Sequence, residues 1–170
     1  MKTLVIHPKD PTTDFLCEIY RDQNFVVLRE NLDWLNLFCR ITRYDRIILL
    51  GHGCQVGLFD GDFIVADDTM SAVLRGREVV AIWCHAKSYI ERNGLTGFYT
   101  DMFISEVQEA EYYGIEATQE QINHSNQCFA ALVRENLGHP DRLKKILDGY
   151  QCVNNPVVQF NIQRLYDTAA

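Results

Sequence analysis

Long apolar runs, a signal-peptide core and an excess of positive charge are all missing from this 170-residue sequence. No apolar stretch approaches the ~20 residues that span a bilayer, and the N-terminal apolar run is too short for an export signal. The net charge is −7, and binding to nucleic acid or to anionic membranes rewards clustered Lys and Arg instead. These absences predict a cytoplasmic protein that binds neither nucleic acid nor membrane.

Metal-binding and cofactor-binding patterns are missing too. The six cysteines are scattered and form no CxxC pair, and His124 and His139 lack partners at metal-ligand spacing, so no metal site is expected. Gly51 and Gly53 lack the third glycine of a dinucleotide fingerprint, and no cofactor is expected. Without an export signal, the thiols are expected to stay reduced.

Repeats, low-complexity segments and linkers are absent, so a single domain over residues 1–170 is expected. The composition is that of a globular protein, with 47% hydrophobic and 23% charged residues. A domain of this size buries roughly 70% of the surface of its unfolded chain, so it needs neither disulfides nor metal to hold a core.

Strand-like apolar runs alternate with helical patterns. The runs at 46–50 (RIILL) and 78–83 (EVVAIW) are continuously apolar, which is typical of strands buried on both faces. Further strands are expected at 3–7, 25–28, 97–105 and 156–162, and a hairpin at 56–65 with Asp60-Gly61-Asp62 in its turn. The pattern predicts an α/β fold, a single three-layer αβα domain with a mostly parallel sheet of about six strands.

Helices are expected between and after these strands. Asp14 is expected to cap the first helix and Asn31 the second, and Asp67 or Asp68 begins a third that ends at Leu74. Later helices are expected at 106–113, 118–137, 140–147 and 163–168. Right-handed crossovers then place the carboxyl ends of the parallel strands at one edge of the sheet.

Two reactive side chains follow the two most apolar strands. His52 comes just after the run 46–50, and Cys84 just after the run 78–83. Ligands of open α/β sheets bind beyond the carboxyl ends of the strands, so these side chains are expected to be neighbours. An imidazole that accepts the thiol proton makes Cys84 a better nucleophile, and the N–H groups of Gly53 and Cys84 could stabilise an oxyanion.

The residues Leu50-Gly51-His52-Gly53 and Trp83-Cys84-His85-Ala86, each after an apolar strand, resemble the caspase-like cysteine peptidases. That group includes caspases, metacaspases, legumains, clostripain-type peptidases and CHAT domains. The resemblance covers roughly residues 2–106. It implies His52 as general acid/base, Cys84 as nucleophile, Gly53 and Cys84 as the oxyanion hole, and cleavage of a peptide or protein substrate through a thioester.

The substrate pocket is less defined. Metacaspases carry an acidic residue two before the nucleophile, where this chain has Ile82, so their preference for Arg or Lys is not implied there. His85 is expected to line the site or to cap a helix. Asp101 and Glu106 either bind a basic substrate side chain or, in the case of Glu106, serve the first turn of the next helix.

Two functions remain open from the sequence. One is a cysteine endopeptidase with a His52/Cys84 dyad. The other is a catalytically silent caspase-like or flavodoxin-like module that holds a ligand or partner at the same sheet edge. The sequence leaves open whether the chain forms a homodimer.

Overall fold

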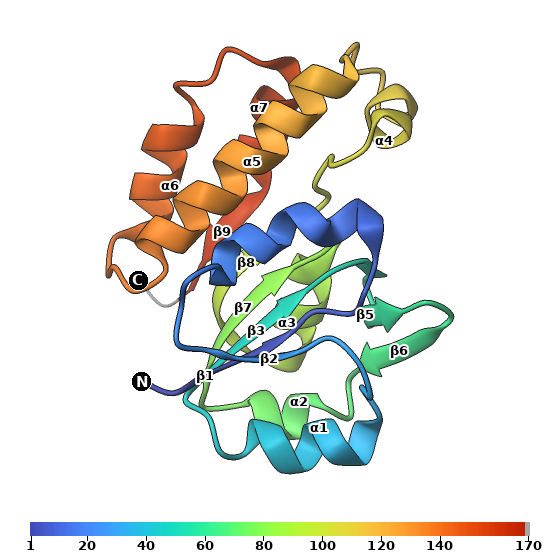
Figure 1. The fold of residues 1–170 in the computed structure, drawn as a ribbon, viewed down its shortest axis with the longest axis vertical. Helices are drawn as coiled ribbons and strands as arrows, with labels where there is room; N and C mark the ends of the chain where they lie inside the picture. Colours follow the sequence, from blue (N-terminus) through green and yellow to red (C-terminus); the bar gives the residue numbers. More distant parts are fainter. Residues whose placement is uncertain (169–170) are drawn as a thin grey trace.

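The structure is a computed structural model and describes residues 1–168. Its centre is a six-stranded sheet in the order β2-β1-β3-β7-β8-β9 (Figure 1). The strands are β1 (Thr3–Ile6), β2 (Val26–Leu28), β3 (Arg46–Leu50), β7 (Glu78–Ile82), β8 (Thr96–Thr100) and β9 (Leu165–Asp167). All neighbouring pairs are parallel except β8 and β9, which are antiparallel. The expected mostly parallel sheet of about six strands is therefore confirmed.

Helices cover both faces of this sheet, an arrangement compatible with three αβα layers (Figure 1). Side chains alternate along a strand, so Ile47 and Leu49 of β3 face one helical layer and Ile48 and Leu50 face the other. One layer contains α1 (Trp34–Ile41), α2 (Ser71–Leu74) and α3 (Ala86–Asn93); the other contains η1 (Pro11–Tyr20), α5 (Gln119–Asn136), α6 (Arg142–Tyr150) and α7 (Pro156–Asn161). Burial on both faces is the reason that the central strands read as continuous apolar runs.

A small antiparallel sheet follows β3 and contains β4 (Gly53–Cys54), β5 (Gly57–Asp60) and β6 (Phe63–Ala66). The predicted hairpin is confirmed as β5 and β6, and Gly61 adopts the positive φ of 57° that its turn requires. Because β4 begins directly after His52, this hairpin fixes the course of the chain beyond the carboxyl end of β3.

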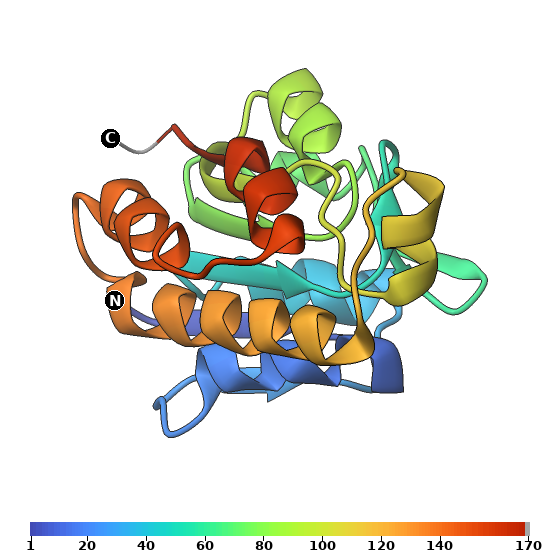
Figure 2. The same cartoon turned by 90° about the horizontal axis from the view of Figure 1, so that it is seen from above.

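The longest helix, α5, runs alongside η1 over one face of the sheet (Figure 2). Thr118 begins it with a capping box, in which Thr118 Oγ1 accepts from Gln121 N and Gln121 Oε1 accepts from Thr118 N. An ion pair between Arg134 of α5 and Glu18 of η1 joins the two helices. Within residues 1–168, no helix combines the length and apolarity that crossing a bilayer requires.

Two expected helix caps were wrong. Asp10 rather than Asp14 caps η1, because its carboxylate accepts from Thr12 N at 2.9 Å. Asp33 rather than Asn31 caps α1, with Asn36 N as the donor, and Asn31 lies outside the helix at φ 55°. In both cases an acidic side chain stands directly before the first helical turn, where a backbone N–H two or three residues on is within reach.

The C-terminal assignment was also wrong. The expected strand at 156–162 is mainly helix α7, since Pro156 occupies its first turn and the Asn155 side chain accepts from Val157 N. The expected helix at 163–168 contains a 3-10 turn, η2 (Ile162–Arg164), and then strand β9. Short apolar runs do not separate helix from strand by periodicity, and here β8 offered an open edge for the last residues to pair with.

Candidate functional site

The carboxyl ends of β3 and β7 meet, as the sequence predicted. Leu50 pairs with Ile82, and Gly51 N donates to Ile82 O at 3.1 Å one residue further on. His52 and Cys84 follow directly, and both line one cavity together with Ile82. The cavity measures only about 20 Å³, room for little more than one water molecule.

His52 is held by residues that the sequence analysis did not single out. Its Nε2 lies 2.6 Å from Thr12 Oγ1 and 3.8 Å from Asp10 Oδ2. Thr12 Oγ1 also lies 2.7 Å from Asp10 Oδ1, and an ionised carboxylate only accepts, so the hydroxyl proton goes to Asp10. His52 Nε2 is then the donor to Thr12, which leaves Nδ1 as the acceptor of the neutral ring.

The hydrogen bond from the Thr12 hydroxyl lowers the pKa of Asp10. Burial opposes this effect, and the hydrogen bond from the Thr12 backbone N–H adds to it. Asp10, Thr12 and His52 thus form an acid–hydroxyl–imidazole chain at the edge of the sheet. Its sequence signal is Asp10-Pro11-Thr12 just beyond the carboxyl end of β1, which places a helix cap beside the expected site.

Cys84 has different partners from the one expected. Its sulfur lies 3.6 Å from both Phe103 O and Glu109 Oε1, and the single thiol proton is shared between these two acceptors. Burial and the Glu109 carboxylate raise the pKa of Cys84 to about 12, so the group is a neutral thiol at pH 7. Within residues 1–168, no hydrogen bond joins Cys84 to His52, so the expected proton sharing is absent from this conformation.

Gly53 has a packing role. A Cβ there would lie 2.3 Å from Trp83 Cδ1 and 2.5 Å from Gly57 O, so only glycine fits beneath the indole. Trp83 Nε1 in turn donates to Cys54 O at 3.1 Å. Trp83, the residue before Cys84, therefore packs against Gly53 and donates a hydrogen bond to Cys54, which lie directly after His52. That the N–H groups of Gly53 and Cys84 act as an oxyanion hole remains a prediction.

The four candidate pocket residues separate into two groups. Ile82 lines the cavity shared by His52 and Cys84. Glu106 lines a larger neighbouring pocket and also stands at the N-cap of the next helix in a capping box with Glu109, so the first-turn alternative left open by the sequence is confirmed. His85 and Asp101 line neither of these spaces, and His85 Nδ1 instead lies 3.1 Å from Asp101 Oδ1. His85 occupies the N-cap position of α3 at φ 68°, as one alternative from the sequence had it, but its side chain makes no capping hydrogen bond within residues 1–168.

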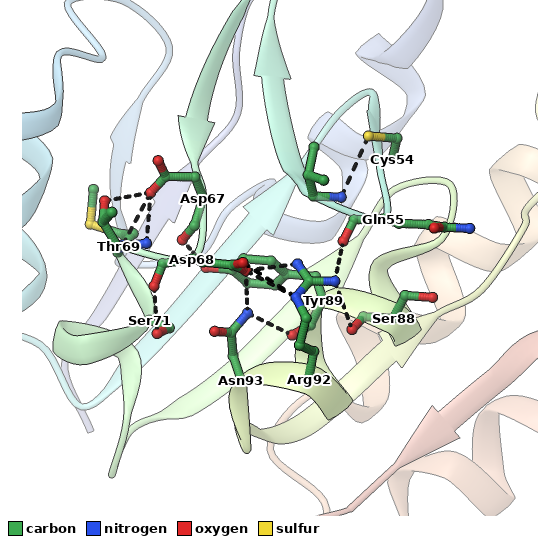
Figure 3. A network of polar contacts seen from close by, with 12 residues as sticks. Cys54, Gln55, Asp67, Asp68, Thr69, Ser71, Ser88, Tyr89, Arg92 and Asn93 are labelled. Carbon is green, nitrogen blue, oxygen red and sulfur yellow. Dashed lines mark hydrogen bonds and ion pairs between the residues drawn. The ribbon is translucent and has the colours of Figure 1, made fainter.

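A polar network fixes the hairpin to α3 (Figure 3). Arg92 of α3 donates to Gln55 O at 2.9 Å and pairs with Asp68 at 2.7 Å, and Asn93 donates to the same carboxylate at 2.8 Å. Gln55 lies three residues after His52, and α3 begins two residues after Cys84. The network therefore ties together the segments that follow the two candidate residues.

A second cysteine and histidine do contact one another, at a place not predicted. Cys17 Sγ lies 3.9 Å from His7 Nδ1, and the Tyr20 hydroxyl lies 2.9 Å from the sulfur and 3.0 Å from the same nitrogen. Burial lowers the pKa of His7 to about 4, so the ring is neutral at pH 7. His7 follows β1 as His52 follows β3, and this position at the end of a strand is the sequence feature that could have pointed to the His7–Cys17 contact.

No family model matches this sequence, and a comparison with curated proteins likewise finds no match. Across residues 1–168, no group of three or more His, Cys, Asp or Glu side chains is placed to hold a metal ion. All six cysteines are free thiols. What the site can do therefore follows from the geometry of His52 and Cys84.

Proposed function

We propose that this protein is a cysteine endopeptidase of the caspase-like type, with His52 and Cys84 as its dyad. The observation that supports it most is the shared cavity, since both side chains line one space beyond the joined ends of β3 and β7. In the described conformation the dyad is not assembled, because Cys84 is hydrogen-bonded to Phe103 O and Glu109 Oε1 rather than to His52.

Catalysis requires Cys84 to leave Glu109 and to give its proton to His52, whose Nδ1 has no hydrogen-bond partner among residues 1–168. The sulfur then attacks the substrate carbonyl carbon, and the carbonyl π pair moves to the oxygen. The N–H groups of Gly53 and Cys84 stabilise that oxyanion. When the C–N bond breaks, the imidazolium protonates the leaving amine and a thioester remains. Water, deprotonated by His52, hydrolyses the thioester and restores the thiol.

Asp10 and Thr12 orient the ring in this mechanism. The Thr12 hydroxyl holds Nε2, and the Asp10 carboxylate at 3.8 Å favours the imidazolium that forms after proton transfer. This is the orienting part that an acid/base histidine needs from a third group. Peptide entry also requires the cavity to widen, since about 20 Å³ does not admit a scissile bond.

A peptide-library cleavage assay tests the proposal. The wild-type chain is expected to cleave a subset of peptides, Cys84→Ala to fall to background, and His52→Ala to lose at least about 100-fold in rate. Cys54→Ala is the matched control, because it removes a nearby thiol outside the shared cavity, and it should cleave normally. Cleavage by Cys84→Ala at the wild-type rate would overturn the proposal.

The second candidate is a catalytically silent module, and the state of Cys84 favours it. A thiol with a pKa near 12 is a poor nucleophile at neutral pH. Iodoacetamide labelling separates the two functions. A peptidase is expected to show Cys84 labelling that falls when His52 is replaced by Ala. A silent module is expected to show Cys84 labelled more slowly than the exposed Cys39 and Cys152, with no effect of His52.

A further inference from the structure

A larger pocket adjoins the cavity of the dyad. It measures about 430 Å³, which lies within the range of small-ligand sites. It lies between the start of η1, the segment 105–108 and α5. Phe15 and Ser105 line both spaces, and Thr12, which contacts His52, lines the larger one. A group held in this pocket would therefore lie next to the dyad.

The lining of the pocket has a single sign of charge. Among residues 1–168, Glu106 is the one carboxylate in the lining, and no Lys, Arg or His side chain belongs to it. Glu106 also stands at the N-cap of the short helix that follows, in a capping box with Glu109, which fixes its position beside the pocket. Most of the pocket's other polar groups are amides, from Gln108, Gln119, Asn123, Asn126 and Gln127. Amides offer donors or acceptors as needed, but the carboxylate favours a cation and disfavours an anion.

Asn126 of α5 carries an unused acceptor beside this pocket. The residue is only 5% exposed, and its Nδ2 donates to Ser105 O at 2.9 Å. Its Oδ1 is buried, and nothing within residues 1–168 donates a hydrogen bond to it. An unmatched buried acceptor destabilises the folded protein, and a hydrogen bond from a ligand N–H would offset that loss. The bond to Ser105 places this acceptor next to a residue shared with the cavity of the dyad.

We propose that the pocket binds the guanidinium or ammonium group of a basic peptide side chain, with Glu106 as its ion-pair partner and Asn126 Oδ1 as a further acceptor. A guanidinium brings five N–H donors, enough for the carboxylate and several amides at once. Because Oδ1 is buried, the lining side chains shift as the ligand enters. The inference rests on the proposed function, which makes this the pocket for a substrate side chain.

The test is direct binding to the full chain carrying Cys84→Ala. The probes are N-acetyl-arginine amide and N-acetyl-citrulline amide, which share a shape but differ in charge. Calorimetry gives the affinity, and side-chain amide signals in NMR report on Asn126. We expect saturable binding of the arginine probe, a shift of the Asn126 amide signals, and at least tenfold weaker binding of the citrulline probe.

Three variants locate the site. Glu106→Gln is expected to weaken the arginine probe at least tenfold, about 1.4 kcal/mol. Glu120→Gln is the matched control, since it removes the same charge from an exposed position on α5 outside the pocket, and it should change nothing. Asn126→Leu should also weaken binding, and Glu106→Gln decides the matter should Asn126→Leu fail to fold.

Absence of saturable arginine binding, equal affinity for the two probes, or unchanged affinity in Glu106→Gln would each overturn the inference. Its failure is distinct from failure of the peptidase proposal, because binding to Cys84→Ala requires no turnover. If the chain binds the arginine probe but cleaves no peptide, the binding pocket is supported and the peptidase proposal is refuted. If the chain cleaves peptides with no preference for basic residues, the peptidase proposal is supported and the inference about this pocket is refuted.

Discussion

Glu109 Oε1 accepts a hydrogen bond from the Cys84 thiol at 3.6 Å, so a carboxylate faces the sulfur where an imidazole was expected. The other oxygen of Glu109 accepts from Ser105 N at 2.7 Å and from Glu106 N at 3.2 Å, which fixes the carboxylate in place. Glu109 belongs to α4 (Val107–Tyr112), so the position of this short helix governs the charge that Cys84 meets.

Replacing Glu109 by Gln should lower the pKa of Cys84, because it removes a negative charge that opposes the thiolate. Each fall of one in that pKa raises the thiolate fraction at pH 7 about tenfold. Iodoacetamide rates at Cys84, followed by mass spectrometry across pH, measure the change. Glu111→Gln, an exposed position on the same helix, should leave the rate unchanged. Identical Cys84 profiles in wild type and Glu109→Gln would refute the role given to the carboxylate.

Replacing Thr12 by Val should raise the pKa of Asp10, because the Thr12 hydroxyl stabilises the ionised carboxylate. The folded-state pKa of Asp10 is lowered, so the stability it contributes is present above its unfolded pKa and is lost as pH falls through the folded value. NMR titration of the Asp10 carboxyl carbon measures the shift. The titration of Asp68, in the separate Arg92 network, serves as the internal control and should not move.

Adding one methyl group at Gly53 should destabilise the fold by about 2–3 kcal/mol, because the new Cβ meets the buried Trp83 ring and the Gly57 carbonyl. Urea unfolding of Gly53→Ala measures the loss. Gly138→Ala is the matched control, with nothing within 4 Å of its Cβ, and should change stability by less than about 0.5 kcal/mol. Equal stability of the two variants would show that the contact with Trp83 relaxes freely.

Stability should fall as pH drops from about 6.5 to 4 because of His7. Its pKa is lowered to about 4 by burial and by Arg29, so the unfolded chain takes up a proton in this window and the folded chain does not. Integrated over the window, the loss is about 3 kcal/mol. Urea unfolding at several pH values measures it. In His7→Gln this part of the pH dependence should disappear, and an unchanged pH profile would contradict the assignment to His7.

The central part of the fold followed from pattern alone. Runs such as 46–50 and 78–83 are long enough and apolar enough that only strands buried on both faces accommodate them, and the structure places them side by side as β3 and β7. The hairpin of β5 and β6 followed from Asp60-Gly61, since few residues other than Gly adopt positive φ readily. These elements depend on the hydrophobicity and backbone preferences of neighbouring residues, and both can be read directly from the sequence.

The C-terminal elements did not follow, because their identity depended on distant partners. Residues 165–167 form a strand only because β8 has a free edge, which β9 then covers. Residues 156–161 include Val157, Val158 and Phe160 and were expected to form a strand, yet Asn155 and Pro156 begin a helix there. An apolar run of this length satisfies both periodicities, and the surrounding structure selects one.

By itself, the sequence determined the α/β sheet and the placement of His52 and Cys84 at one of its edges, since both follow from buried strands and right-handed crossovers. Only the tertiary structure decided which groups those side chains meet. Thr12 and Asp10 reach His52 from η1 and the residue that caps it, and Glu109 reaches Cys84 from α4, across separations of tens of residues. Hydrogen bonds and pKa values depend on distances of a few ångströms, and no spacing along the chain encodes these.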